Sequence, residues 1–310
     1  MISIVIPLYN KERQIENTLN SVFSQTFQDF EIVIVNDGST DNSAGIVKKI
    51  DDKRIQLIEQ KNQGVSVARN TGIQAAKYNY IALLDADDEW KPAYLETQID
   101  LIRTFPECQV FACAYVFKKG KKITLVVLNK IPFQGEKGLL TNYFEVASCS
   151  HPPLWTSAVV VKKEAIQSVG GFPEHVTSGE DLLTWARLAV RYQIAYSIKA
   201  EALFVFDQSH EISAVPSRPH DQNDVVGDGL THLYQEEKRL TTKKQLKKYL
   251  SLWYKMRASV YLRLSDKKLT LKYSVQSLKY DKANWKVYLF MLMAILPVRF
   301  QQIIKKHYPQ

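Results

Sequence analysis

The first hundred residues alternate short apolar runs, rich in β-branched side chains, with segments whose apolar positions recur at helical spacing. The runs are typical of buried strands and the segments of amphipathic helices, so together they predict βαβ units that build a mostly parallel sheet. We expect strands at 3–7, 31–35, 54–59 and 80–84, and helices at 11–24, 42–50 and 65–76. Thr40 or Asp41 is expected to cap the helix at 42–50.

The pattern changes twice further along the chain. Up to about residue 209 we expect a mixture of helices and strands. The helices are expected from just after Pro92 to about residue 104, at 163–169 and at 180–191, and the strands at 110–117, 123–128 and 156–161. A loop rich in Pro, His, Asp and Gly at 210–229 predicts a boundary, after which the pattern is helical and basic. The expected regions are an α/β half at 1–105, a mixed half at 106–229 and a helical appendage at 230–310.

Charge separates this appendage from the rest of the chain. The net charge of the whole chain is +9, yet residues 231–310 hold eighteen Lys and Arg against four Asp and Glu. The rest is therefore acidic, and a basic partner surface is expected only in the tail. The apolar run at residues 1–6 has no basic segment before it and is broken by Pro7, which indicates a strand and not a signal peptide. We therefore expect a cytoplasmic protein.

Cysteine chemistry contributes little to the expected function. Cys108, Cys113 and Cys149 are an odd set without a CxxC pair. This spacing argues against a disulfide framework and against a cysteine-based metal site. Buried free thiols are the simpler interpretation.

Carboxylates follow the strand expected at 80–84. Asp85 and Asp87 lie one residue apart at a strand end, which is where α/β sheets bind ligands. Two such carboxylates repel each other when both are ionised, and a bound divalent cation relieves that repulsion. Mg²⁺ or Mn²⁺ can share its oxygen ligands between a carboxylate and the diphosphate of a substrate. A solvated acidic turn is the alternative for the pair taken alone.

Five blocks in order along residues 2–210 resemble the inverting family 2 glycosyltransferases of the GT-A fold. The blocks are Ile4-Val5-Ile6-Pro7-Leu8-Tyr9-Asn10, Val35-Asn36-Asp37-Gly38-Ser39-Thr40-Asp41, Asn62-Gln63-Gly64-Val65-Ser66-Val67-Ala68-Arg69-Asn70-Thr71-Gly72, Leu84-Asp85-Ala86-Asp87-Asp88, and Gly170-Gly171-Phe172 followed by Gly179-Glu180-Asp181. Each block alone is weak, whereas the ordered set is specific. The resemblance implies a GT-A α/β fold with a helical C-terminal appendage, and transfer of a sugar from a nucleotide diphosphate donor, with uracil as the expected base. In this fold residues 1–105 are expected to bind the nucleotide sugar, and residues 106–229 to bind the acceptor and supply the catalytic base.

The resemblance also implies a role for individual residues. Asp87 is the expected metal ligand, and Asp85 lies nearer the donor ribose or a metal-bound water. Asp37 is expected to read the nucleobase edge, with Pro7 and Tyr9 forming the other wall of the base pocket. Asp181 is expected to act as the general base, with Glu180 supporting it. His210 lies in a stretch that resembles a loop covering the donor, and it is a further candidate metal ligand.

Each assignment has a simpler alternative in the local sequence. Asp37 lies in an Asn-Asp-Gly turn, which can be structural only. The forked guanidinium of Arg69 suits either the donor diphosphate or an ion pair with nearby carboxylates. Acidic residues are also favoured at helix N-termini, which would explain Glu180 and Asp181 without catalysis. A lone histidine such as His210 is often just a polar surface group.

The basic tail allows two interpretations. Its aromatic and cationic residues alternate, and an apolar stretch at 285–297 is too short to span a membrane. It fits an interfacial helix on an anionic membrane, which would place the protein peripherally at the inner face of the cytoplasmic membrane. It also fits a helical bundle that packs on the catalytic domain. Nucleic acid binding is not expected, because no nucleic-acid motif accompanies the charge.

The function expected from the sequence is transfer of a hexosyl or N-acetylhexosaminyl group to a saccharide acceptor in the synthesis of a cell-surface polysaccharide. This acceptor is expected to be lipid-linked. The alternative from another class is a catalytically inactive GT-A-like protein that binds nucleotide sugars or acts as a scaffold. A dinucleotide-dependent dehydrogenase is excluded, because the first strand lacks a GxGxxG after it. A nucleotidyltransferase would show a Gly-rich basic phosphate loop early in the chain, and none is present.

Overall fold

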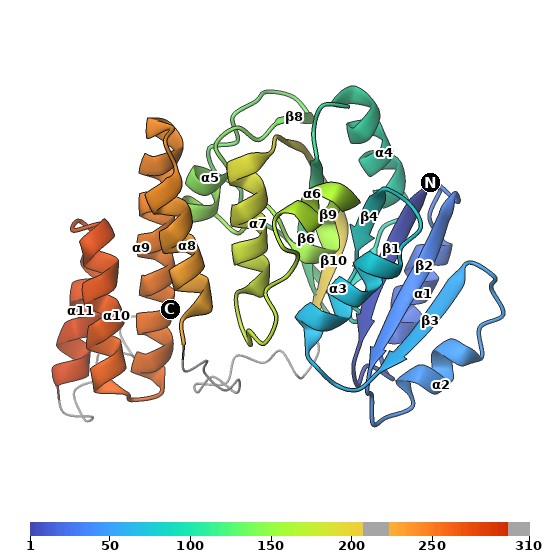
Figure 1. Ribbon diagram of the computed structural model, residues 1–310, viewed down its shortest axis with the longest axis horizontal. Helices are drawn as coiled ribbons and strands as arrows, with labels where there is room; N and C mark the ends of the chain where they lie inside the picture. Colours follow the sequence, from blue (N-terminus) through green and yellow to red (C-terminus); the bar gives the residue numbers. More distant parts are fainter. Residues whose placement is uncertain (207–222, 297–310) are drawn as a thin grey trace. The chain divides into compact units, whose positions relative to one another are not determined.

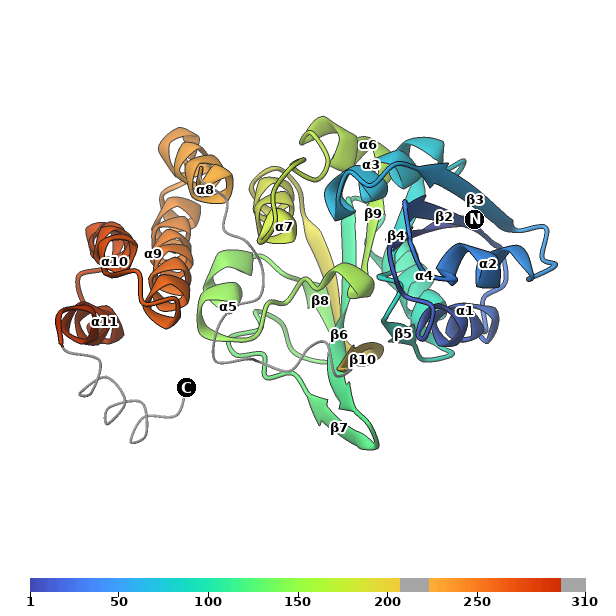
Figure 2. The same cartoon turned by 90° about the horizontal axis from the view of Figure 1, so that it is seen from below.

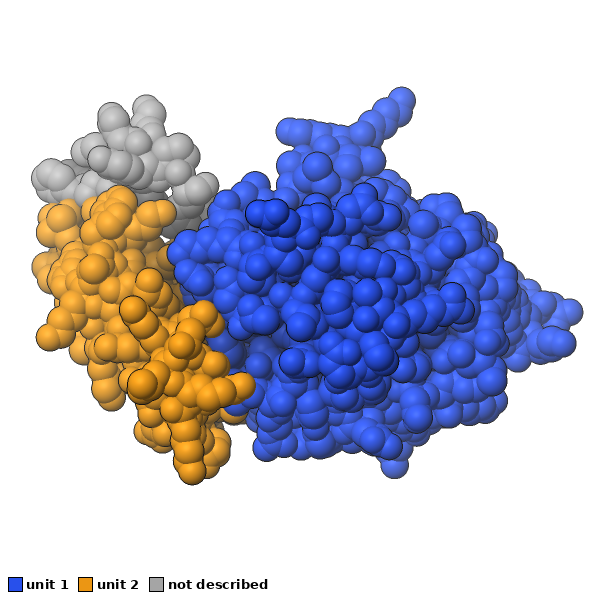
Figure 3. All heavy atoms as spheres, turned by 90° about the horizontal axis from the view of Figure 1, so that it is seen from above, with its two compact units in different colours: residues 1–211 blue, residues 212–310 orange. Residues whose placement is uncertain are grey.

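The computed structural model describes residues 1–206 and 223–296 of the chain. The chain divides into two compact units, Met1–Glu211 and Ile212–Gln310, which Figure 3 shows in different colours. The described part of the first unit holds a mixed sheet covered by helices, and that of the second unit is helical. The second unit begins before residue 230, where the helical appendage was expected, and helix α8 (Val225–Glu236) begins within the stretch expected to be a loop.

The sheet of the first unit has the order β3-β2-β1-β4-β9-β6-β10-β5. Its parallel half follows the expected βαβ pattern, with β1 (Ile2–Leu8) between β2 (Phe30–Asp37) and β4 (Tyr80–Leu83), and β3 (Ile55–Gln60) at the edge. The other half is mixed. The antiparallel strand β9 (Val159–Lys162) joins β4 to β6 (Val110–Lys119), which runs parallel to β10 (Ile194–Phe206). Three short strands complete it: β5 (Glu89–Trp90), β7 (Lys122–Leu125) and β8 (Lys137–Leu139).

Helices cover both faces of this sheet (Figures 1 and 2). Helices α3 (Val65–Ala75) and α6 (Lys163–Ser168) lie on one face, and α1 (Ile15–Phe23) and α4 (Tyr94–Thr104) lie on the other. The first face is tight, because a Cβ on Gly72 of α3 would lie only 2.4 Å from Val5 Cγ1 of β1. Three further helices are α2 (Ser43–Lys48), α5 (Tyr143–Cys149) and α7 (Glu180–Arg191).

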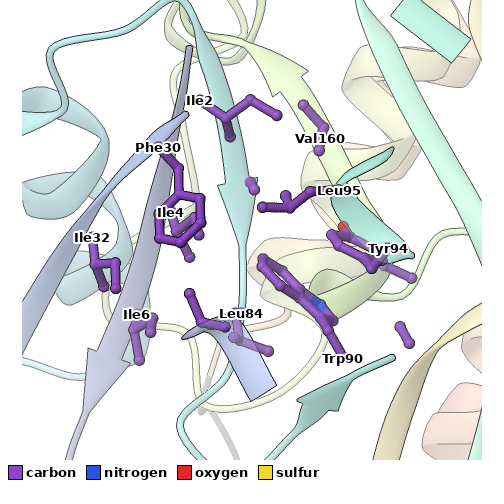
Figure 4. Packing of buried hydrophobic residues seen from close by; sticks show 14 of the residues in the cluster. Ile2, Ile4, Ile6, Phe30, Ile32, Leu84, Trp90, Tyr94, Leu95 and Val160 are labelled. Carbon is purple, nitrogen blue, oxygen red and sulfur yellow. The ribbon is translucent and has the colours of Figure 1, made fainter. Parts of the chain in front are cut away.

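The main apolar core lies between the sheet and helices α1 and α4. Alternate residues of β1 point into it and are fully buried, as strand periodicity requires. Figure 4 shows this packing, in which the rings of Trp90 and Tyr94 stack with their centroids 4.1 Å apart. Burial of this many large side chains holds the sheet rigid, and the ends of its strands are therefore fixed in position.

Several elements differ from the expected ones. Helix α1 begins at Ile15 and not at residue 11, and the backbone amides before it bond to the next loop, with Lys11 N donating to Ser43 Oγ (2.8 Å) and Glu12 N to Asp41 Oδ2 (3.0 Å). Asp41 organises this loop and also caps α2 with its side chain, because its Oδ1 accepts a hydrogen bond from Ser43 N (3.0 Å), although the N-cap position itself is Asn42. Strand β10 was not expected from the sequence, and a short 3₁₀ turn at Thr156–Ala158 replaces the start of the strand expected at 156–161. Of the thiols expected to be buried, Cys108 and Cys113 are, whereas Cys149 is exposed.

The second unit is built from α8, α9 (Leu240–Arg263), α10 (Lys267–Tyr280) and α11 (Trp285–Ile295). Asp224 caps α8, because its Oδ1 accepts hydrogen bonds from Gly227 N (3.0 Å) and from Trp253 Nε1 (3.1 Å). Tyrosine rings stack between α9 and α10, with centroids 5.3 Å apart for Tyr261 and Tyr273. Within the described residues, no helix is long and apolar enough to cross a membrane.

Candidate active site

The predicted donor-site carboxylates lie at one edge of the sheet. Asp37 ends β2, and Asp85 follows Leu84, whose amide donates to Val5 O of β1 (3.1 Å). Because β2, β1 and β4 are adjacent and parallel, their carboxyl ends meet at this edge. Pro7 and Tyr9 lie at the same end of β1, and Tyr9 is exposed. The sheet thus gathers residues that the sequence spreads over eighty positions.

Asp37 is buried and organises the loop that leads into α3. Its Oδ1 accepts hydrogen bonds from Gln60 Nε2 (2.7 Å) and Gln63 N (2.9 Å), and its Oδ2 accepts one from Gly64 N (2.8 Å). Gly64 has φ +94°, a conformation that favours glycine. Asp37 therefore has a structural role in this loop. Its expected contact with the nucleobase stays a prediction.

The three aspartates after β4 have different partners. Asp85 Oδ1 accepts a hydrogen bond from Arg69 Nη2 (2.7 Å), and Asp87 Oδ2 lies 2.6 Å from Lys11 Nζ. Asp88 is buried, and its carboxylate accepts hydrogen bonds from Ser157 Oγ (2.6 Å) and from Val205 N (3.2 Å). Burial, together with the charges of Asp87 and Asp85, raises the pKa of Asp88 well above its usual value. The like charges expected to need a counter-ion are thus compensated by separate groups.

Asp88 also fixes the position of Asp85. Asp88 accepts from Ser157 Oγ, and the same Oγ accepts a hydrogen bond from Asp85 N (3.1 Å). Trp155 adds a third donor, because its Nε1 lies 3.3 Å from Asp88 Oδ2. Neither Asp88 nor Ser157 was singled out from the sequence. The signal available for Asp88 was its place in the Asp-Ala-Asp-Asp block, whereas Ser157 carried none.

Arg69 connects this loop to the start of helix α7. Its side chain is 5% exposed, and besides Asp85 it contacts Glu180 Oε1 through Nη1 (3.1 Å). The guanidinium also lies over the ring of Phe172, 5.0 Å from its centroid. Burial opposes the charge of Arg69, but Asp85 and Glu180 outweigh it and raise the pKa of the guanidinium. Of the two uses expected for Arg69, the structure shows the ion pairs.

The residue after Arg69 holds the glycine-rich turn before α7. Asn70 Nδ2 donates to Phe172 O (2.9 Å), and Phe172 N donates to Asn70 Oδ1 (2.9 Å). Gly171, at φ +64°, has no room for a side chain, because its Cβ would lie 2.6 Å from Asn70 Oδ1. Phe172 packs on the fully buried Trp185 of α7. Arg69 and Asn70 together therefore fix α7 relative to α3.

Glu180 and Asp181 open helix α7 after Gly179, which has φ +87°. Burial is the largest influence on the Asp181 carboxyl and, with the charge of Glu180, raises its pKa to about 7, against the opposing effect of Arg69. Tyr115, which also senses the charge of Asp181, has its own pKa raised, mainly by burial. A carboxyl with a pKa near neutrality has the property that a general base requires.

Lys11 is a site residue that the sequence did not reveal. It lies in the stretch expected to begin a helix, but the later start of α1 leaves it in the loop, where its ammonium reaches Asp87. Both side chains are partly buried, with exposures of 27% for Lys11 and 14% for Asp87. The cation therefore neutralises the carboxylate that is expected to bind metal.

The residues present fit a metal that is shared with a substrate. Among the described residues, no group of three His, Cys, Asp or Glu side chains is placed to hold a metal ion. However, Mg²⁺ is usually bound through one or two carboxylates together with substrate phosphates. Asp87 and the nearby Asp85 supply such carboxylates. Each of them already pairs with a cationic side chain, Lys11 or Arg69, so both lie in surroundings that favour their ionised form. His210 lies outside the described residues.

Two solved structures similar to this one each hold a nucleotide sugar. The chain superposes on Staphylococcus aureus TarS 1–349 in complex with UDP-GlcNAc with a TM-score of 0.63 and 18% identity, over 91% of this chain and 92% of that one. A mannosyltransferase of Pyrobaculum calidifontis, in complex with GDP-Man and Mn²⁺, gives a TM-score of 0.57 and 18% identity over 100% and 87% of the two chains. These likenesses confirm the expected GT-A fold.

Curated relatives match shorter stretches of the chain. GlyA of Streptococcus pneumoniae, a glycosyltransferase, is 45% identical over 98 residues, which are 31% of this chain and 14% of GlyA. An uncharacterised glycosyltransferase of Rickettsia conorii is 32% identical over 201 residues, which are 62% of this chain and 31% of that protein. The matches thus span less than a third of these two relatives. The model of the family "Glycosyl transferase family 2" matches residues 3–160, about half of the chain, and the chain therefore belongs to glycosyl transferase family 2.

Proposed function

We propose that this glycosyltransferase moves a hexosyl or N-acetylhexosaminyl group, with inversion, from a UDP-sugar to a saccharide acceptor. The observation that carries the proposal is the pair of ion pairs made by Arg69, which joins Asp85 to Glu180. This contact brings the expected donor and metal side of the site next to the expected base, Asp181. A single displacement requires both in one place, because the acceptor loses its proton as the donor diphosphate leaves.

Asp181 accepts the proton of the acceptor hydroxyl in this mechanism. Its raised pKa suits that task, because a base of pKa near 7 is both substantially ionised at neutral pH and strong enough to take the proton. Glu180 raises this pKa, and Arg69 holds Glu180 in place. No covalent intermediate is needed, because the attacking hydroxyl displaces the diphosphate directly.

Asp87 and Asp85 hold the divalent metal and orient the donor. A bound Mg²⁺ or Mn²⁺ supplies positive charge that stabilises the leaving diphosphate. Lys11 adds a second cation beside Asp87. Asp37, Pro7 and Tyr9 surround the nucleobase of the donor. Uracil is proposed for this nucleobase on the resemblance, and the UDP-GlcNAc complex of the TarS neighbour supports it.

The proposed acceptor is lipid-linked, and the proposed place of action is the inner face of the cytoplasmic membrane, in the synthesis of a cell-surface polysaccharide. The support for this part is the charge of the tail, where the described residues 223–296 hold fifteen Lys and Arg against six Asp and Glu. Each such residue near an anionic leaflet contributes on the order of 1 kcal/mol.

A panel of nucleotide sugars tests the proposal. Thermal shift with Mn²⁺ present should show stabilisation by one UDP-sugar above the others, since a ligand that binds only the native state stabilises it. The same donor should release UDP when a suitable saccharide acceptor is added. Binding of a donor without any turnover would instead support the inactive binding protein considered as the alternative.

A further inference from the structure

Most aromatic side chains of the tail are used inside the helical unit. Trp253, Tyr254 and Tyr261 of α9 are buried, as are Tyr273 and Tyr280 of α10. The buried guanidinium of Arg257 adds to this packing, 5.2 Å from the centroids of both the Tyr261 and the Tyr273 rings. These residues hold the helices together, so they are not available to contact a membrane.

Helix α11 differs, because large apolar side chains are exposed along one side of it. Trp285 is 62% exposed, Tyr288 51%, Leu292 53% and Ile295 68%. Tyr288, Leu292 and Ile295 lie three, seven and ten positions after Trp285, which is the spacing of one helix face. On other sides of the helix Val287, Met293 and Ala294 are buried. We call Trp285, Tyr288, Leu292 and Ile295 the α11 face.

The helical unit that carries this face is basic. Its described residues, 223–296, hold fifteen Lys and Arg against six Asp and Glu. Lys286 follows Trp285 in the sequence but is turned about 100° from it around the helix, toward the side of the buried Met293, so the face itself is apolar. The positive charge of the unit around an apolar face favours an anionic partner.

We propose that the α11 face inserts into the interface of an anionic phospholipid bilayer. This inference rests on the membrane association proposed above and assigns it to one face of one helix. Eleven residues of helix measure about 16 Å, half of the hydrocarbon thickness, so α11 lies in the interface and does not span it. Trp and Tyr side chains are favoured at that depth.

Charge favours a bilayer over a second copy of the chain as the partner of this face. In a two-fold symmetric dimer the same patch meets itself, which would bring two basic helical units together. An anionic leaflet complements both the apolar stripe and the positive charge of the unit. The α11 face is therefore assigned to lipid.

Flotation of the full chain with vesicles tests the assignment. Wild type should float with mixed phosphatidylcholine and phosphatidylglycerol vesicles and not with phosphatidylcholine alone. The double variant Leu292→Glu/Ile295→Glu should bind at least about tenfold more weakly, because the burial of each such side chain is worth more than that factor. The charge-matched control is Leu240→Glu/Val275→Glu, which changes two exposed apolar residues of α9 and α10. It should float nearly as wild type does.

Trp285 reports the depth of insertion. Anionic vesicles should shift tryptophan emission to the blue in the wild type, and Trp285→Phe should lose that shift while it still floats, because Phe keeps the apolar surface. The proposal would be overturned if both double variants lost binding equally, or if the wild type did not bind anionic vesicles. It would also be overturned if light scattering showed that the wild type is a dimer and that Leu292→Glu/Ile295→Glu, but not the control, is a monomer. Flotation needs no sugar, so binding without turnover would leave the α11 face standing while the proposed transfer failed.

Discussion

Lys11 and Asp87, which are 76 positions apart in the sequence, form an ion pair of 2.6 Å at the centre of the candidate site. The carboxylate proposed to hold a divalent metal is thus already neutralised by a side chain of the protein. Binding of a metal to Asp87 competes with this contact.

Replacement of Lys11 should therefore strengthen the binding of bare metal. We expect Lys11→Met to raise the affinity for Mn²⁺, measured by titration calorimetry without donor, by about fivefold, because a partly exposed ion pair is worth up to about 1 kcal/mol. Lys48→Met is the matched control, since Lys48 pairs with Glu59 on the surface. Unchanged or weaker Mn²⁺ binding in Lys11→Met would show that the lysine does not compete.

Arg69 should be more important for stability than an arginine at the surface. Arg69→Met leaves Glu180 and Asp85 without their buried counter-charge and should lower the free energy of unfolding by about 3 to 5 kcal/mol. Arg54→Met is the comparison, because Arg54 pairs with Asp52 at a more exposed place and its loss should cost about 1 kcal/mol. Denaturant unfolding measures both. Equal costs for the two variants would mean that the Arg69 network does not hold α7 in place.

The sheet could be predicted from the sequence much better than the contacts around the site. Strand β1 and its neighbours are continuous apolar runs, so their pattern is unambiguous. Strand β10 was missed because Lys199 and Glu201 interrupt its apolar pattern, at the place where its register with β6 shifts. Lys11 was missed for another reason. The helical spacing of the following residues also fits residues 11–14, but these form a loop, which is held by hydrogen bonds from the backbone to Ser43 and Asp41.

The tail shows a further limit of sequence patterns. The spacing of Trp253, Tyr254 and Tyr261 on α9 suits either a membrane surface or a neighbouring helix, since both are apolar. Only the structure shows that they contact neighbouring helices, because Tyr273 of α10 stacks on Tyr254 and Tyr261, and Trp253 donates to Asp224 at the start of α8. The motif residues around Asp85 and Asp181 were found by resemblance, whereas the bridge through Arg69 required the structure.

General base catalysis by Asp181 predicts a selective loss of rate. Asp181→Asn should lower kcat for transfer by roughly 10² or more, because an amide cannot accept the proton. Donor and metal affinities, measured by calorimetry, should stay unchanged. An unaltered kcat with a true acceptor would refute the role, and so would donor affinity that falls together with the rate.

The raised pKa of Asp181 predicts how the rate depends on pH. Below about pH 7 the carboxyl is increasingly protonated and cannot act as a base, so kcat/KM should rise with pH through an apparent pKa near 7. Glu180→Gln removes the neighbouring negative charge and should move this limb to lower pH. Glu174→Gln, an exposed carboxylate on the turn before α7, is the control and should leave the limb in place. If the apparent pKa of this limb does not change in Glu180→Gln, the limb does not report the titration of Asp181.

The central claim is that Asp87 binds a metal on which transfer depends, in the same site as the base. The most direct test is release of nucleoside diphosphate from the donor selected by thermal shift, measured for wild type and Asp87→Ala with Mn²⁺ and with EDTA. We predict release by wild type with Mn²⁺ only, and none by Asp87→Ala although it unfolds at nearly the same temperature as wild type. Full release by Asp87→Ala, or release by wild type in EDTA, would contradict the account.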